Sequence, residues 1–588
     1  MPRPLSFVLT GFLALAGCSQ AADPLPPEEG ARAALARGDG FDAEVALREQ
    51  MQGGAAREAV AAAMGEAELQ QGQLAEARKW LQPGRFTEET AGRGFLMLGR
   101  LEMRSGNLPA AGTAYDRALQ FIPDDPELWV DIARLRYRGG EQTQAVEAAV
   151  RAIELGPDNP AALLLRGQLA RDAEGMAAAL SYFEKALERQ PDNLDLLAEY
   201  SATLGELGRA TESLAIARRI VKLDPAYQRA YFLQAVIAAR GARFDLARKL
   251  LTLSGDHGRD VPAGIMLGGV IDMEQGNFAS AAQAFDRLNR LQPENRQVRE
   301  LLARSLSLGA NHKELVHRFD AEARLLSASP YMRVIVARAH EALGSRDQAA
   351  ALLDRAADPQ DDDLVAMQPA VALSVTSTRG VGDAQDALSL VRGRIVSGDR
   401  SGAITAAKAF QQRYPGAADA FALLGDAYLS NRQIGAALQA YDKAAQVRRT
   451  WPLARRMIAA LRAVGRRDDA IALAEAHLAG NPSNGELASM LARFAYDAGD
   501  LGRASALLDQ ALRHGYDRDA DVLSLRAMVA QRQGDIETAR RWGHLAVSVQ
   551  PQGSGPLQAL AMVERGAAAR SALAKARKLE NSTALARR

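Results

Sequence analysis

The sequence has very little cysteine and few aromatic residues. Its 588 residues include one cysteine, Cys18, and aromatic side chains make up 5% of the chain. A single thiol can form neither an intramolecular disulfide nor a cysteine cage for a metal ion. β-Branched residues are also sparse beside Ala, Leu, Arg and Glu, a balance that favours helices over strands. The sequence therefore excludes a disulfide-stapled fold and predicts an all-α protein.

An excess of charge of one sign is absent as well. The chain has 72 Lys and Arg side chains and 71 Asp and Glu side chains, which leaves a net charge of +1. No global electric field would draw such a protein to nucleic acid or to an anionic bilayer, so we expect no nucleic-acid partner. The length exceeds what one hydrophobic core supports, which indicates several domains or a repeat array.

The first residues have the features of an export signal. A short basic start precedes an apolar run over residues 5–16, which is too short to span a bilayer but suits the hydrophobic region of a secretory signal. Residues 15–18 read Leu-Ala-Gly-Cys and resemble the bacterial lipobox. The resemblance implies a signal peptide over 1–17 and a lipidated Cys18 at the start of a flexible tether, 18–27. The alternatives are an ordinary signal peptide with an incidental cysteine, or a buried cysteine in a helix.

The residue after the cysteine bears on the destination. In lipoproteins of two-membraned bacteria an Asp at that place tends to mark retention in the inner membrane, and here the residue is Ser19. The resemblance therefore implies a lipid anchor at the periplasmic face of the outer membrane, with the inner membrane as the alternative. Lipoproteins of this type carry several acyl chains, and more than one chain is needed for stable anchoring.

A period of 34 residues runs through the chain. Five prolines lie at intervals of 34, 34, 34 and 68 residues: Pro123, Pro157, Pro191, Pro225 and Pro293. Units can be started at 24, 58, 92, 126, 160, 194, 228, 262, 296 and 330. The eighth residue of units two to ten is always small: Gly65, Gly99, Ala133, Gly167, Ser201, Ala235, Gly269, Ala303 and Ala337. A fixed period of this length indicates stacked helical hairpins.

This pattern resembles the tetratricopeptide repeat. The unit that starts at Gly92 shows it best, with Phe95, Leu98, Gly99, Gly106, Ala111, Tyr115, Ala118 and Pro123. Small residues let two helix backbones approach, larger ones fill the grooves between them, and proline stops the second helix. The resemblance implies a right-handed α-solenoid of about fifteen helix hairpins.

The repeats form two predicted blocks. The first covers 28–363, and the second covers 384–553 with units starting at 384, 418, 451, 485 and 520. Residues 364–383 interrupt the period, either as a hinge, which we favour, or as an extra packed turn. Residues 554–588 are predicted to form a capping helix and tail, because a repeat array needs its last apolar face covered.

No group of residues predicts catalysis. The seven histidines show no metal-binding spacing, Asp361 to Asp363 lack the spacing and turn glycine of a calcium loop, and no glycine-rich segment continues as a phosphate loop. We therefore expect no catalytic, cofactor or metal site and no small-molecule substrate.

The inner face of the solenoid is the predicted binding surface. In proteins with these repeats, residues near places 2, 5, 9 and 12 of each unit tend to line the groove. One basic and aromatic group consists of Arg93, Arg100, Met103, Arg134, Tyr137, Gln168 and Arg171. An apolar group follows with Phe232, Val236, Met266, Val270 and Met273, and then Arg304, Tyr331 and Arg338.

These residues suggest a partner segment with an apolar centre and acidic flanks. The alternative is that the apolar side chains pack against neighbouring repeats and the arginines are solvated.

By analogy, these features predict a non-catalytic, periplasm-facing, membrane-anchored scaffold for protein partners. Its expected role is envelope assembly, such as polysaccharide export, secretion, or pilus or outer-membrane assembly. An alternative is an accessory subunit that positions or regulates a glycosyltransferase or peptidoglycan enzyme. Direct glycan binding is less favoured, because the chain has four tryptophans and they are scattered.

Overall fold

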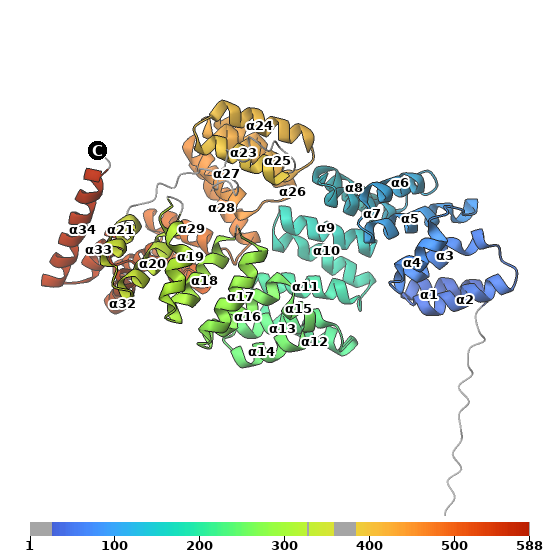
Figure 1. Cartoon of the computed structure of the whole chain (residues 1–588), viewed down its shortest axis with the longest axis horizontal. Coiled ribbons are helices and arrows are strands. Elements are labelled where there is room, and N and C mark those ends of the chain that lie inside the picture. Colours follow the sequence, from blue (N-terminus) through green and yellow to red (C-terminus); the bar gives the residue numbers. More distant parts are fainter. Residues whose placement is uncertain (1–25, 294, 326–327, 358–383, 587–588) are drawn as a thin grey trace, which may run out of the picture. The chain divides into compact units, whose positions relative to one another are not determined.

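A computed structural model describes residues 26–586 apart from 294, 326–327 and 358–383. These residues form thirty-three helices and no strand (Figure 1). Consecutive helices pair into hairpins, which confirms the predicted all-α solenoid. The chain divides into two compact units, 1–135 and 136–588. This division lies far from the predicted interruption at 364–383, all of which is outside the described residues.

The N-terminal unit consists of helices that pair in chain order. They are α1 (Pro27–Arg37), α2 (Gly40–Gln52), α3 (Arg57–Gln70), α4 (Leu74–Leu81), α5 (Glu88–Arg104), α6 (Leu108–Leu119) and most of α7 (Pro126–Arg138).

The second unit begins with the part that we call the middle repeats, 136–357. Its helices after α7 are α8 (Gln142–Leu155), α9 (Pro160–Ala173), α10 (Met176–Arg189), α11 (Leu194–Glu206), α12 (Ala210–Leu223), α13 (Gln228–Arg240), α14 (Phe244–Leu253), the short α15 (Gly255–Arg259), α16 (Pro262–Glu274), α17 (Phe278–Leu291), α18 (Arg296–Leu308), α19 (His312–Ala323), α20 (Pro330–Ala342) and α21 (Arg346–Ala357).

The second unit ends with the part that we call the C-terminal repeats, 384–586. Its helices are α23 (Ala384–Val396), α24 (Arg400–Arg413), α25 (Ala418–Ser430), α26 (Ile434–Val447), α27 (Trp451–Ala463), α28 (Arg467–Gly480), α29 (Gly485–Asp497), α30 (Leu501–Arg513), α31 (Ala520–Arg532), α32 (Ile536–Val549), α33 (Ser554–Val563) and α34 (Gly566–Ala586).

The first helix of most hairpins begins where a sequence unit was predicted to start. This holds for α7, α9, α11, α13, α16, α18 and α20, and for α23, α25, α27, α29 and α31. Helix α5 is different, because it begins at Glu88, four residues before the predicted start at Gly92. The short helix α15 is an addition that the period did not predict. The 34-residue period thus records the helix boundaries themselves.

The small residue at the eighth place of a unit has a specific neighbour. A Cβ added at Gly99 would overlap the ring of Tyr115, sixteen residues later in the same hairpin. Gly269 stands in the same relation to Phe285, whose Cε1 would lie 2.7 Å from an added Cβ. Both rings are fully or almost fully buried. In these two hairpins the first helix therefore requires glycine at this place, because the aromatic ring from the second helix occupies the space that a side chain would fill.

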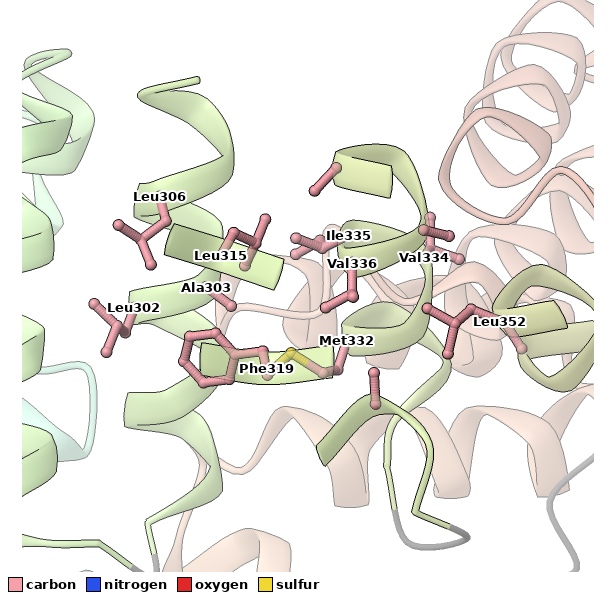
Figure 2. Packing of buried hydrophobic residues seen from close by; sticks show 14 of the residues in the cluster. Leu302, Ala303, Leu306, Leu315, Phe319, Met332, Val334, Ile335, Val336 and Leu352 are labelled. Atoms are coloured by element: carbon pink, nitrogen blue, oxygen red, sulfur yellow. The ribbon is translucent and has the colours of Figure 1, made fainter. Parts of the chain in front are cut away.

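Each hairpin also packs against the next one. Figure 2 shows this for α18 to α21, where Leu302 and Leu306 face Leu315 and Phe319, and Met332 and Val336 continue the cluster. Leu315 is the twentieth residue of its unit, a place that holds alanine in most of the first ten units, and it is completely buried. The core is therefore a chain of local clusters, each shared between neighbouring hairpins, as in other repeat arrays.

The C-terminal segment closes the array with two helices rather than one. Helix α33 packs on α31 and α32, and α34 runs back along α33. Val563 and the partly buried Leu560 of α33 cover Ala527, Ala530 and Trp542. The apolar face of the last hairpin is thereby removed from water, which is the task of a terminal cap.

Several sequence predictions concern residues outside the described part of the chain. These are the signal peptide at 1–17, Cys18, nearly all of the tether and the interruption at 364–383, and they stay predictions. Among the helices between residues 26 and 586, none has the length and apolarity to cross a bilayer.

Candidate functional site

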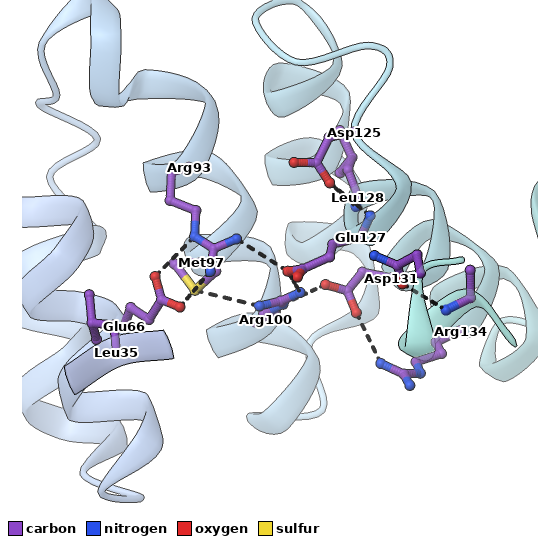
Figure 3. Close-up of polar contacts among 12 residues, drawn as sticks. Leu35, Glu66, Arg93, Met97, Arg100, Asp125, Glu127, Leu128, Asp131 and Arg134 are labelled. Atoms are coloured by element: carbon purple, nitrogen blue, oxygen red, sulfur yellow. Dashed lines mark hydrogen bonds and ion pairs between the residues drawn. The ribbon is translucent and has the colours of Figure 1, made fainter. Parts of the chain in front are cut away.

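Charged side chains join the inner helices of three successive hairpins in the N-terminal unit (Figure 3). We call this group the inner ladder; it consists of Glu66 on α3, Arg93 and Arg100 on α5, and Glu127, Asp131 and Arg134 on α7. All of these residues lie on first helices, and Arg93, Arg100 and Arg134 are among the predicted groove residues.

The contacts of the inner ladder run from one hairpin to the next. Arg93 donates to both carboxylate oxygens of Glu66, at 2.9 and 2.5 Å, and to Glu127 at 3.2 Å. Arg100 donates through Nε to Asp131 at 2.5 Å and through Nη2 to Glu127 at 3.0 Å. Two-pronged contacts of this kind are the geometry in which guanidinium and carboxylate groups interact best. The ladder therefore fixes the register of α3, α5 and α7.

The side chains of the ladder differ in exposure. Asp131 is 7% exposed at its side chain, whereas Arg93, Glu127 and Arg134 are about two-fifths exposed (39%, 41% and 43%). Arg134 makes one contact, 3.3 Å to Asp131. Burial alone would lower the pKa of Arg100, but its two carboxylate partners raise it, so the guanidinium stays charged. The exposed members remain within reach of a partner.

A shorter group of the same kind lies in the middle repeats. Glu199 on α11 accepts from Arg171 at 2.6 Å and from Arg229 at 2.8 Å. Burial tends to raise the pKa of Glu199, but the charges of Arg229 and Arg171 lower it overall. The predicted groove residue Arg171 is therefore engaged by the next hairpin of its own chain.

The other predicted groove residues differ in their surroundings. Arg338 is exposed and pairs with Glu341 on its own helix at 2.6 Å. Partly buried residues pack on local clusters or lie between helices: Gln168, Phe232, Met266, Val270, Arg304 and Tyr331. Phe232 also has its ring centroid 5.1 Å from that of His257.

Met103 and Met273 were predicted to line the groove, but the structure places both in the core. They are 9% and 7% exposed. The thioether of Met273 accepts from the Ser305 hydroxyl at 3.8 Å. The reason is geometric, because a first helix also packs on the following hairpin, and a shift of one residue turns a side chain from groove to core. Partner binding by the remaining residues stays a prediction.

Two predicted groove residues have neighbours in the C-terminal repeats. Burial raises the pKa of Tyr137, and Asp172 and Asp419 raise it further while Arg448 lowers it. Burial likewise raises the pKa of Tyr331, whose charged neighbours include Arg304 of the middle repeats and Arg518 and Asp517 of the C-terminal repeats. The inner side of the middle repeats is therefore close to residues more than 180 positions away in sequence.

A buried polar group in the C-terminal repeats was not predicted. Asp426 of α25 accepts from the Tyr441 hydroxyl at 2.8 Å and lies 3.0 Å from Nε of Arg456. Burial raises the pKa of Asp426 although Arg456 opposes the shift. Tyr441 fills the aromatic place of its hairpin against Gly425, so its hydroxyl brings a polar atom into the core. The position of Tyr441 in the repeat could have indicated burial, but nothing in the pattern indicated its acidic partner.

Among the described residues, no three His, Cys, Asp or Glu side chains are placed to hold a metal ion. Two histidines are buried: His340 contacts Asp320 at 2.8 Å, and burial lowers the pKa of His477 to about 4. Both are explained by packing between helices.

The fold and these surfaces define an α-solenoid built from helical hairpins whose inner helices carry polar side chains. One family model for the tetratricopeptide repeat matches residues 62–126, 130–193 and 388–454, and a second one matches 461–529. The chain therefore contains tetratricopeptide repeats, which are in general non-catalytic modules for protein interaction.

Solved structures with similar folds come from several systems. PilF of Pseudomonas aeruginosa is 16% identical, with 37% of this chain and 99% of that chain covered and a TM-score of 0.33. PilW, described as a type IV pilus biogenesis factor, is 18% identical, with 36% and 98% covered and a TM-score of 0.31. The Cut9 and Hcn1 complex is 13% identical, with 92% and 96% covered and a TM-score of 0.32. The comparison with curated proteins gave no match.

Proposed function

We propose that the chain is a non-catalytic scaffold that binds protein partners at the periplasmic face of the outer membrane and serves envelope assembly. The observation that carries the proposal is the array of about fifteen hairpins, since tetratricopeptide repeats act as protein-interaction modules. The membrane attachment rests on the lipobox-like Leu15 to Cys18, and the assembly systems in question are polysaccharide export, secretion, and pilus or outer-membrane assembly.

The exposed part of the inner ladder is the surface that we propose for partner binding in the N-terminal unit. Arg134 is a suitable contact because it is 43% exposed and its ion pair with Asp131, at 3.3 Å, is long. An exposed ion pair contributes about 0–1 kcal/mol, so a partner carboxylate can replace it at little cost. Arg100 is less suitable, because its charge neutralises a buried Asp131.

Site-specific photo-crosslinking in living cells tests this surface. A photoreactive residue at position 134 is expected to trap one defined envelope protein. The matched control carries the same residue at Asp116, which is exposed on α6, the second helix of the preceding hairpin. Equal products at 134 and 116, or none at 134, would contradict partner binding through the inner ladder.

The anchor is tested separately at Cys18. Processing of the chain is expected to be sensitive to globomycin, and Cys18→Ala is expected to move the protein from the outer-membrane fraction to the soluble periplasmic fraction. A Cys18→Ala protein that is processed and sedimented like the parent chain would refute lipid anchoring, whatever the crosslinking shows.

A further inference from the structure

The middle repeats and the C-terminal repeats touch through their loops, in a regular series. Thr143 donates its backbone N–H to the carbonyl of Gly416 at 3.1 Å, and Ala418 donates its N–H to the Gln142 side chain at 3.0 Å. One hairpin further on, Arg449 donates to the carbonyls of Asp172 and Ala173, at 2.9 Å through its backbone N–H and at 3.2 Å through Nε. We call these contacts the turn interface.

The series continues along both sets of repeats. The Ser483 hydroxyl lies 3.5 Å from a carboxylate oxygen of Glu206, and the Gln550 amide donates to the Ala356 carbonyl at 2.6 Å. The middle repeats contribute the end of a first helix at Asp172 and Glu206, and the start of the second helix, after the turn, at Thr143. The C-terminal repeats contribute the loop between one hairpin and the next. Successive loops therefore meet successive turns.

These contacts satisfy helix ends that would otherwise lack partners. The first N–H groups and the last carbonyls of a helix have no partner inside it. Thr143 and Ala418 are in the first turns of α8 and α25, and Asp172 and Ala173 are the last two residues of α9. Each set of repeats thus caps helices of the other. Capping is specific in position, which explains why the two sets meet in one register.

At one point of the turn interface the backbones of the two sets of repeats lie so close together that only glycine fits. Gly480, the last residue of α28, lies against Glu174 and Gly175 of the turn after α9. A Cβ at position 480 would be 2.9 Å from the carbonyl oxygen of Glu174 and 3.1 Å from Cα of Gly175. The 34-residue pattern gives no reason for a glycine at 480, because this place is not one of its small positions.

Charged residues of the C-terminal repeats also lie near two of the predicted groove residues. Tyr137 has Asp419 and Arg448 among its charged neighbours, and the loop after α30 brings Asp517 and Arg518 to Tyr331. The loop between α30 and α31, residues 514–519, is longer than the loop of three residues between α26 and α27. Helix α26 also contacts α8 and α9, and α28 contacts α10, so the middle repeats are already in contact with a segment of the same chain.

The apolar cores on the two sides are built separately. The cluster around Phe183 draws on residues between 153 and 200, and the cluster around Tyr441 draws on residues between 421 and 473. The turn interface can therefore separate without opening either cluster, since the contacts that form it are at loops and helix ends. Regions held in this way open locally at a lower free energy than the cores beside them.

We propose that the C-terminal repeats occupy the inner side of the middle repeats and are held there by reciprocal helix capping. In the closed form the surface around Tyr137 and Tyr331 is taken. Release of the turn interface, with both sets of repeats still folded, frees it for another protein. This autoinhibitory contact does not depend on the proposed envelope role, and its test needs no partner.

Amide hydrogen exchange at single-residue resolution on the full-length chain measures the release directly. The N–H groups of Thr143 and Arg449 are the probes, because both donate across the turn interface. We expect them to be protected, but to exchange faster than amides in the middle of α8 and α26. Exchange at the rate of an unstructured chain would show that the interface is not formed. Exchange only together with the helix interiors would show that it never opens alone. Either outcome overturns the proposal.

Gly480→Leu should favour the open form. If the overlap costs the closed form about what over-packing costs a core, the Thr143 and Arg449 amides exchange roughly ten- to a hundredfold faster. The matched control is Gly435→Leu in the first turn of α26, where an added Cβ meets no atom within 4 Å. Unchanged exchange at Thr143 in Gly480→Leu would overturn the proposal.

A second variant covers the case in which Gly480→Leu does not fold. Arg449→Ala removes the contact from Nε to the Ala173 carbonyl and leaves the backbone contact to Asp172 in place. It should speed exchange at Thr143 severalfold without changing the amides inside α9. No change at Thr143, or an equal rise inside α9, would contradict release as a separate event.

Discussion

The fit between Gly99 and Tyr115 can be tested by two alanine substitutions with opposite expected signs. Both Gly99, in α5, and Gly112, in α6, are inside helices, where alanine is preferred to glycine by about 1 kcal/mol per residue. At Gly112 the nearest atom to an added Cβ is Cδ2 of Leu135 at 3.7 Å, an ordinary contact. Gly112→Ala should therefore stabilise the N-terminal unit by about 0.5–1 kcal/mol.

At Gly99 the same propensity gain is opposed by overlap with a buried ring. The added Cβ meets three ring atoms of Tyr115, which is 2% exposed and cannot swing into solvent. Over-packing of a filled core costs about 1–3 kcal/mol. Gly99→Ala should therefore leave the unit up to about 2 kcal/mol less stable, after subtraction of a propensity gain of about 1 kcal/mol.

Because the chain is a repeat array, the measurement has to report the stability of one hairpin and not of the whole chain. Unfolding of a long array need not be two-state, so a single midpoint for the whole chain is a poor readout. Native-state hydrogen exchange in α5 and α6 gives the local opening free energy of this hairpin instead. Tyr115→Leu should partly rescue Gly99→Ala, because the smaller side chain leaves room for the methyl group. If Gly99→Ala is as stabilising as Gly112→Ala, the small residue at this place of the repeat has a different cause.

Two further outcomes follow from the charged groups. Arg100→Ala leaves the nearly buried Asp131 without its main cation and should destabilise α5 and α7 by about 1–3 kcal/mol. Arg134→Ala should change the stability of the same helices by less than about 0.5 kcal/mol. Hydrogen exchange in α5 and α7 measures both effects. The folded-state pKa of Glu199 is lowered, so its contribution is complete above the unfolded-state pKa of about 4.3 and is lost as the pH falls through the folded value. Glu199→Gln should therefore reduce the acid sensitivity of α11 below about pH 4.5 in a pH series of the same measurement.

The sequence predicted the hairpins well because each hairpin depends on contacts between residues close in sequence, and the same contacts recur in every unit. Proline spacing and the small residues opposite aromatic rings recur every 34 positions, so a pattern too weak in one unit is clear in ten. Twelve first helices begin at a predicted start for this reason. The early start of α5 at Glu88 also has a local cause, since Thr87 and Thr90 cap the helix reciprocally and extend α5 toward its N-terminus.

The partners of the groove side chains were beyond the reach of the pattern. Arg93, Arg100 and Arg171 were correctly placed on first helices, but the period does not say which residue of the next hairpin faces them. That depends on the angle between hairpins, which is set by packing. The carboxylates at Glu66, Glu127 and Glu199 were therefore missed, although all lie 27 to 34 positions from their arginines.

The turn interface was missed for another reason. Its partners are about 275 residues apart in the cases of Thr143 and Gly416, and of Arg449 and Asp172. A repeat signal reports contacts between neighbours, and it carries no information on two distant stretches that meet. Glycines that the repeat does not require, such as Gly416 and Gly480, were the available signal. Both lie where another backbone passes close by.

These contacts change what the array can do. A solenoid stabilised only by contacts between neighbouring repeats leaves its inner surface accessible. Here a few caps, each contributing about 1 kcal/mol, hold one part of the array against another. A total of a few kcal/mol leaves an open form populated at roughly 0.1–10%. A partner that binds the open form therefore overcomes only this small free energy. Affinity for the inner side of the middle repeats should consequently rise when the turn interface is weakened, without any change in the surface that the partner touches.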